Sequence, residues 1–462
     1  MSSIGGHRSM AGGGLSRTLL KGGCVLSLDR RVGNFQRADV LIDGATIAAV
    51  GPDLRAGNAE TLDATDTIVM PGFVDTHRHV WECLFRNLGD HGPIRDGDPG
   101  ALSREIGPAY RPEDVYAGNL VGLLSAIDAG ITTLLDWSHV QATPEHTDAA
   151  IAAHREAGIR AVFAYGVPWW SDADRNHAER IRRLAGAQFS TTDQLLTLAL
   201  ALAGPEFAPM EANEADWALA REVGARISVH VGVGKYGRRG KLAEMARAGL
   251  LGPDTTYVNC ATLSDEEIGM IADSGGWFSL AAQAGMMNGY GMPPIQQLLD
   301  RQLKPSLSVD AESNVPTDMF TQMRAVISIQ HASLFDLKLA GKGGVPNLLT
   351  TRRILEFATI EGARANGLGD VTGTLTPGKQ ADIIVLRTDR PNIHPVNDPI
   401  GAVVWGMDTS NVDSVFVAGR ALKRDGELVG VDMNRVGGLA YEARDHVARN
   451  AGMELPAVGA LR

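Results

Sequence analysis

The chain has 462 residues, of which 44% are hydrophobic and 21% charged, and its formal net charge is −11 at pH 7. This length predicts one large soluble domain with a smaller one beside it. The acidic balance, without a basic cluster, argues against a nucleic-acid surface. No apolar run reaches the 18 or so residues that a membrane helix needs. Three scattered cysteines are too few for a disulfide framework, so we expect a cytoplasmic protein.

Residues 17–66 contain short apolar segments separated by Gly or Asp-Gly turns, which is typical of small β-strands. From residue 67 the pattern changes to an alternation of strands and helices, with helices predicted, for example, at Pro112–Ala129 and Pro144–Ala157. Eight strands are predicted, at 68–74, 131–136, 160–165, 195–202, 226–231, 256–259, 277–280 and 307–310. This α/β alternation predicts a (β/α)8 TIM barrel over residues 67–371, with its active site at the C-terminal ends of the strands.

The last part of the chain returns to short strands. A helix is predicted over residues 348–368, and strands follow within 372–430, including Ala402–Trp405. Strands at both ends of one barrel predict a small β-sandwich built from residues 17–66 and 372–430. Residues 431–462 are predicted to form a C-terminal helical extension.

A motif at the end of the first barrel strand indicates metal binding. The apolar run Val69–Val74 leads into Asp75, and His77 and His79 follow at spacing i, i+2. In an extended segment this spacing places both imidazoles on one face. Two neutral imidazoles at a strand end can chelate one metal ion, although a polar loop that happens to hold two histidines is the alternative.

The segment Pro71–His79 resembles the first-strand signature of the amidohydrolase superfamily, and in particular the branch of cytosine deaminases, S-adenosylhomocysteine deaminases and triazine chlorohydrolases. About 300 residues later, Gly373–Leu386 resembles the segment by which that branch returns to its small β-domain. Two signatures in the right order are more specific than either alone. The resemblance covers nearly the whole chain and implies the same barrel and small domain.

The resemblance also implies a ligand set. His230 closes the fifth predicted strand and Asp310 the eighth, where members of that branch complete a mononuclear site with His77 and His79. Three imidazoles and one carboxylate suit Zn²⁺ or Fe²⁺. Residues 195–202 carry no lysine, whereas binuclear members bridge two metals with a modified lysine there, so we expect one divalent ion. Asp310 is also expected to take the proton of the attacking water.

Two departures from the resembled branch weaken the link to ring deamination. Asn259 stands at the end of the sixth strand, where the branch has a histidine that orients water. An amide can hydrogen-bond water or substrate but cannot shuttle a proton at neutral pH. The deaminases also have a glutamate a few residues after the histidine of the fifth strand, but residues 231–236 contain no carboxylate.

Other strand-end side chains are candidates for the missing chemistry. His139 follows the second strand and is our candidate for proton transfer or substrate contact, with capping of a backbone group as the alternative. Aromatic and sulfur-containing side chains at the same mouth are candidates for substrate binding, with rim or core packing as the alternative: Trp137, Trp169, Trp170, Met287 and Tyr290.

Together these features predict a metal-dependent amidohydrolase, in which metal-bound hydroxide attacks a C–N or similar bond in a small cyclic or aromatic compound. Asp310 is predicted to return the water proton to the leaving group, and Asn259 to position water or substrate. A lyase, decarboxylase or ring-opening enzyme on the same metal is a second interpretation, and a catalytically inactive binding protein a third. We expect a small-molecule substrate, no nucleic-acid or membrane partner, and a homodimer or homotetramer.

Overall fold

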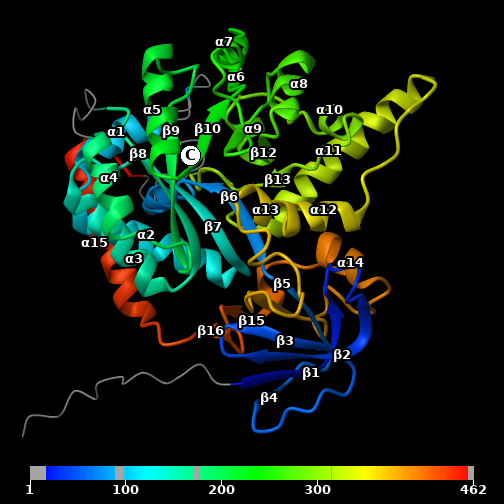
Figure 1. Cartoon of the computed structure of the whole chain (residues 1–462). Helices are drawn as coiled ribbons and strands as arrows, with labels where there is room; N and C mark the ends of the chain where they lie inside the picture. Colours follow the sequence, from blue (N-terminus) through cyan, green and yellow to red (C-terminus); the bar gives the residue numbers. More distant parts are fainter. Residues whose placement is uncertain (1–16, 89–97, 99, 171–176, 314, 456–462) are drawn as a thin grey trace, which may run out of the picture.

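The computed structural model describes residues 17–88, 98, 100–170, 177–313 and 315–455. Eight parallel strands pair in chain order in one sheet, which curves into the barrel in the upper half of Figure 1. They are β6 (Phe73–Arg78), β7 (Ile131–Ser138), β8 (Arg160–Gly166), β9 (Leu196–Leu202), β10 (Arg226–Val231), β11 (Thr255–Asn259), β12 (Trp277–Leu280) and β13 (Ser306–Leu307). A parallel bridge between Arg78 and Asp310 joins the two edges, so the predicted barrel is present and nearly closed.

Helices surround this sheet, as expected when each parallel strand returns through a crossover. The predicted helix at Pro144–Ala157 is present with those bounds, and the one predicted from Pro112 ends at Asp128. The helices of the barrel region are α1 (Ala101–Ile106), α2 (Pro112–Asp128), α3 (Pro144–Ala157), α4 (His177–Ala187), α5 (Met210–Glu222), α6 (Gly234–Gly237), α7 (Leu242–Arg247), α8 (Asp265–Asp273), α9 (Ala282–Met287), α10 (Ile295–Asp300), α11 (Met319–Leu339), α12 (Thr351–Phe357) and α13 (Ile360–Ala365). Among the described residues between β6 and α2 are two 3-10 helices, η1 (Val80–Phe85) and η3 (Gly107–Ala109).

The two ends of the chain form a second sheet, which lies below the barrel in Figure 1. Its strands are β1 (Arg17–Leu26), β2 (Asn34–Asp43), β3 (Thr46–Gly51), β4 (Glu60–Asp63), β5 (Thr67–Pro71), β14 (Ile383–Arg387), β15 (Val412–Val417), β16 (Arg420–Arg424) and β17 (Glu427–Leu428). The antiparallel pair β5–β14 joins the N-terminal and C-terminal strands. The predicted small β-domain therefore exists as one nine-stranded sheet made by both termini.

The boundary between this sheet and the barrel differs from the prediction. The run at 68–74 was predicted as one barrel strand, but β5 pairs with β1 and β14, and the barrel begins only at Phe73. Gly72 lies between the two strands. A larger residue does not fit there, because a Cβ atom would lie 2.1 Å from the Thr132 side chain. The domain boundary thus falls at residue 72 rather than 66.

Two further predictions were wrong in detail. Ala402–Trp405 is part of the π-helix η4 (Ala402–Gly406), not a strand. It continues the short helix α14 (Pro399–Gly401), which Asp398 caps by accepting from the backbone N–H groups of Ile400 and Gly401. The predicted helix at 348–368 is split into α12 and α13, because Thr359 between them has non-helical backbone angles.

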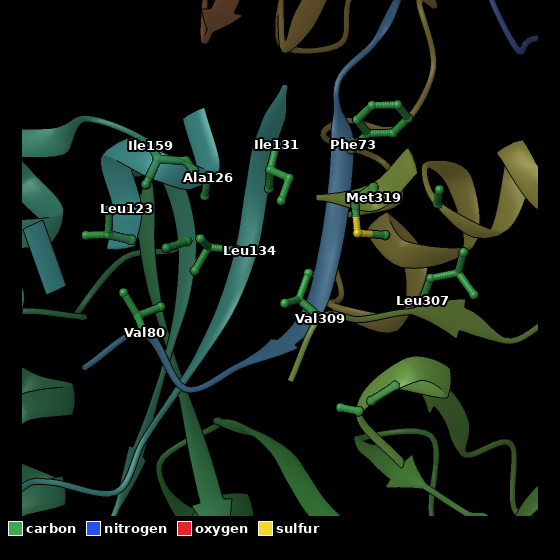
Figure 2. Close-up of a cluster of buried hydrophobic side chains, with 14 of the residues drawn as sticks. Phe73, Val80, Leu123, Ala126, Ile131, Leu134, Ile159, Leu307, Val309 and Met319 are labelled. Carbon is green, nitrogen blue, oxygen red and sulfur yellow. The ribbon is translucent and has the colours of Figure 1, made fainter. Parts of the chain in front are cut away.

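The residues of the barrel core come from strands and helices that are distant in the sequence. Figure 2 shows Phe73 of β6, Leu134 of β7 and Leu123 of α2 among these buried side chains, with Met319 of α11 nearby. The C-terminal extension forms α15 (Met433–Ala451), which packs against α2. The structure describes four more residues after this helix. Among the described residues no helix is long and apolar enough to span a membrane.

Candidate active site

Four side chains converge at the C-terminal end of the barrel where β6 meets β13. His77 is on β6, His79 directly follows that strand, and His230 is on β10. Asp310 lies three residues beyond β13 with a left-handed φ of 72°, which aspartate tolerates better than most residues. Its backbone N–H donates to the His77 carbonyl at 2.9 Å, and the His79 N–H donates to the Asp310 carbonyl at 3.2 Å. Barrel closure itself therefore brings these residues together.

The four side chains have the geometry of a metal site. His77 Nε2 lies 3.2 Å from both His79 Nε2 and His230 Nε2, and Asp310 Oδ1 lies 3.3 Å from the Nε2 atoms of His77 and His79. All four ligand atoms lie within 4.8 Å of one another. Three imidazole nitrogens so close together cannot all be satisfied by hydrogen bonds to each other, since each neutral ring has only one N–H. A single cation accepts all four lone pairs, so the residues fit one Zn²⁺ or Fe²⁺.

The electrostatics of the site favour the metal-binding forms of three of the four groups. For the fourth, His79, burial opposes protonation, but the carboxylates of Asp310 and Glu82 outweigh that effect and raise the pKa. Burial holds the pKa values of His77 and His230 below the ordinary value, so their rings are neutral. Burial opposes ionisation of Asp310, but its hydrogen bonds from His77 and His79 outweigh that effect and hold the pKa of Asp310 well below its usual range. Neutral imidazoles and an ionised carboxylate are the forms that bind a divalent cation.

A second layer of contacts orients the ligand rings. His79 Nδ1 lies 3.1 Å from the carbonyl oxygen of Trp137, which makes Nδ1 the protonated nitrogen and leaves Nε2 free. The Trp137 indole packs edge-on against His230 at 4.6 Å between ring centroids and against His79 at 5.3 Å. Trp137, predicted to bind substrate, is only 1% exposed and is not among the residues lining the cavity, so in this structure its contacts are with the ligand rings.

A small cavity opens onto three of the four side chains, those of His79, His230 and Asp310. Of the predicted substrate-binding residues, Trp169 and Tyr290 line it. Trp170 does not: it packs against Trp81 at 5.8 Å. Met287 does not either, because it lies at the end of α9 with 60% of its surface exposed. The spacing after the seventh strand could not reveal that α9 turns this side chain outward.

His139 lines the cavity beside His79, with a ring-centroid separation of 4.8 Å. Its Nδ1 lies 3.4 Å from both the Trp81 N–H, a donor, and the Trp137 carbonyl, an acceptor. Nδ1 can therefore be either protonated or free. Its Nε2 has no hydrogen-bond partner among the described residues and lies 3.7 Å from the carboxylate of Glu82. Burial lowers the pKa of His139 well below its ordinary value.

Asn259 ends β11 with φ 71°, and its side-chain atoms have no hydrogen-bond partner among the described residues. It is buried but is not among the residues lining the cavity.

The loop after His230 is held in place by hydrogen bonds to a residue that follows a neighbouring strand. Glu206, which follows β9, accepts from the backbone N–H groups of Gly232 at 2.5 Å and Val233 at 3.1 Å. Val233 lines the cavity.

Several residues near the site were missed by sequence reasoning. Glu82 lines the cavity and accepts from the Ser103 hydroxyl at 2.7 Å. Its position three residues after His79 was the available signal, because one 3-10 turn returns a side chain to the same side. Ser103, Phe207 and Glu206 gave no such signal, since nothing in their spacing relates them to the histidines.

Comparison with known proteins places the chain in a family. The model of the amidohydrolase family matches residues 68–422. A 5'-deoxyadenosine deaminase from Methanothermobacter thermautotrophicus is 31% identical over 430 residues, covering 89% of this chain and 95% of that protein. A 5-methylthioadenosine/S-adenosylhomocysteine deaminase from Syntrophobacter fumaroxidans is 29% identical, covering 90% of this chain and 95% of that protein.

Solved structures share the fold. A zinc-bound adenosine deaminase from Xanthomonas campestris superposes with a TM-score of 0.80 at 22% identity, covering 94% of this chain and 98% of that one. Atrazine chlorohydrolase TrzN from Arthrobacter aurescens TC1, complexed with zinc, gives a TM-score of 0.81 at 22% identity, covering 92% of this chain and all of that one. The family model and the extended identity confirm the resemblance seen in the first strand: this chain belongs to the amidohydrolase family.

Proposed function

We propose that the protein is a mononuclear zinc hydrolase that replaces an amino group, or a similar leaving group, on a planar nitrogen heterocycle by water. The observation that carries this proposal is the convergence of His77, His79, His230 and Asp310, the last three of which line a cavity with aromatic walls. Deaminases of 5'-deoxyadenosine and 5-methylthioadenosine, which match nearly the whole chain, make adenine-containing compounds the first substrates to test.

The protein groups have separable roles in this reaction. A zinc ion held by the four residues would lower the pKa of water and polarise the carbon under attack. Asp310 has one oxygen directed at His77 and His79, whereas its Oδ2 has no hydrogen-bond partner among the described residues. Oδ2 is therefore the base that takes the water proton. The aromatic ring of Trp169 and the phenol of Tyr290 form walls against which a planar ring can stack.

The leaving group needs a proton, and the proton that Asp310 takes from water is the source of it. The resembled deaminases have a glutamate a few residues after the histidine of the fifth strand, whereas residues 231–236 here contain no carboxylate. We assign the relay of this proton to His139. Its Nδ1 can donate to the Trp137 carbonyl, which leaves the unpaired Nε2 at the cavity wall free to accept the proton from Asp310 and release it to the leaving group. Glu82, 3.7 Å away, orients the ring.

Replacing His139 by alanine is expected to lower kcat about 10²-fold or more, the usual scale for a lost general acid–base group. Zinc content should stay near one equivalent, because His139 is outside the set of four ligands. Turnover and metal content of wild type and His139→Ala, measured side by side, test this. An unchanged kcat would make His139 a bystander.

Glu206 gives the site a pH dependence. Burial raises the pKa of Glu206 to about 7, with Glu267 adding to the rise and Gly232, Val233 and Arg239 opposing it. Only the ionised carboxylate accepts well from both backbone N–H groups, so kcat/KM should fall as the pH drops through about 7. In Glu206→Gln that inflection should vanish, and the value at pH 8 should approach that of wild type at low pH.

Stability should change in the opposite sense. Because the folded-state pKa of Glu206 exceeds its ordinary value, its contribution is fully present below pH 4.5 and is lost as the pH rises through about 7. The Tm of wild type relative to Glu206→Gln should therefore decline over that range. Parallel pH profiles of both proteins would refute the assignment.

The reaction class is tested with the zinc-loaded protein. Ammonia release from 5'-deoxyadenosine, 5-methylthioadenosine and amino-substituted triazines should identify a substrate, and oxygen-18 from labelled water should appear in the product. A product that contains no oxygen from water would instead favour a lyase or decarboxylase. Turnover of no compound by a fully metallated protein would favour an inactive binding protein.

Three finer features belong to the same proposal. Metal analysis of the purified protein distinguishes zinc from iron. A cytoplasmic location fits the three free cysteines, and fractionation of cells tests it. A homodimer or homotetramer would cover apolar side chains that are exposed on α11 and η4, including Phe335, Leu339 and Trp405. Light scattering after size-exclusion chromatography measures the mass.

A further inference from the structure

A second cavity adjoins the one above the metal ligands. Its volume is about 580 Å³, and it shares two of its walls, Trp169 and Phe207, with the inner cavity. We propose that this outer pocket is a substrate subsite for an uncharged, planar apolar substituent, of the size of a phenyl ring, attached to the heterocycle that reacts in the inner cavity. The inference rests on the proposed function and adds to it that the substrate has two parts.

The walls of the outer pocket suit such a group. Its apolar residues come from the segments that follow three neighbouring strands: Val167, Pro168 and Trp169 after β8, Ala203 and Phe207 after β9, and Tyr236 after β10. Phe207 is 38% exposed, so a ligand that covers it removes aromatic surface from water. Pockets of this composition at the end of a barrel are typical of small-molecule sites.

A continuous row of rings connects the two cavities. The Trp169 indole lies 4.7 Å from the His139 ring and stacks on Phe207 at 6.2 Å with an interplanar angle of 18°. Phe207 in turn lies 5.2 Å from Tyr236. A planar substituent that leaves the inner cavity past Trp169 therefore meets further aromatic faces, with which it can stack.

The charges around the pocket indicate that the substituent is uncharged. Arg104 forms an ion pair with Asp98, and His177 lies 3.3 Å from Asp216. Each of these four wall residues thus already has a polar partner within the protein. A charged substituent would have to compete for these pairs, whereas an apolar one leaves them intact.

The test measures binding, so it does not depend on turnover. Adenine and 9-benzyladenine are titrated into the zinc-loaded full-length protein by calorimetry. We expect 9-benzyladenine to bind at least tenfold more tightly than adenine. In Tyr236→Ala that advantage should fall below about threefold while the affinity for adenine is unchanged, because Tyr236 lines the outer pocket and not the inner cavity. Tyr441→Ala, which removes an exposed tyrosine of α15 outside both cavities, is the matched control and should keep the full advantage.

A second variant tests the same pocket by filling it. Ala215 is an exposed wall residue on α5, so Ala215→Trp adds bulk to the outer pocket with little effect on folding. It should also abolish the benzyl advantage. If wild type binds both compounds equally or neither, or if the advantage survives in both variants, the subsite is refuted. Failure of every heterocycle to be hydrolysed would refute the proposed function alone, because the benzyl advantage is measured separately.

Discussion

Replacing His230 by alanine is expected to remove both the metal and the activity. The wild-type protein should contain close to one equivalent of zinc, and the variant less than a tenth of that. Without His230, the site loses one of its three imidazoles and a contact at 3.2 Å to His77, and three ligands on a solvent-accessible cavity bind zinc far more weakly. Turnover should fall by about 10³-fold or more, because the reaction depends on metal-activated water. Elemental analysis and kcat/KM measured on the same samples test this.

The matched control is His394→Ala. This histidine is exposed in the segment after β14, far along the chain from the barrel strands, and should be replaceable without loss of metal or activity. His77→Ala should behave like His230→Ala. A His230→Ala protein that keeps a full equivalent of metal and near-normal turnover would contradict the ligand set.

Replacing Asp310 by asparagine is expected to separate metal binding from catalysis. Asparagine keeps an oxygen that can face the ion, so the variant should retain most of its zinc. It cannot take a proton from water, however, so kcat should fall by about 10³-fold, or roughly 4 kcal/mol in activation free energy. KM should change little, since the lost interaction is used mainly in the transition state.

Asp336→Asn serves as the control, because Asp336 is an exposed carboxylate on α11. It should leave both metal content and kcat at wild-type values. If Asp310→Asn retains metal and turns over substrate at a near-normal rate, Asp310 is not the base. If instead it loses all of its metal, its role is that of a ligand, and the proton must go to another group such as His139.

Local sequence patterns were sufficient to predict most of the fold. The switch from short strands to strand–helix alternation after residue 67 predicted the barrel, and the return of strands after 372 predicted the small β-domain. These predictions succeed because hydrophobic periodicity and turn residues act over short distances. They failed where tertiary contacts decide which sheet a strand joins. The apolar residues of β5 suit a strand of either sheet, and in the structure β5 pairs with β1 and β14 of the small sheet.

The same division holds for the candidate site. The sequence by itself determined that His77 and His79 share a strand face, because their spacing fixes it, and family resemblance added His230 and Asp310. Only the tertiary structure decided that Glu82 faces His139, that Glu206 holds the loop after His230, and that Met287 points to solvent. These relations join residues from different elements or depend on the direction of a loop. They follow from barrel closure and packing, which spacing along one strand does not encode.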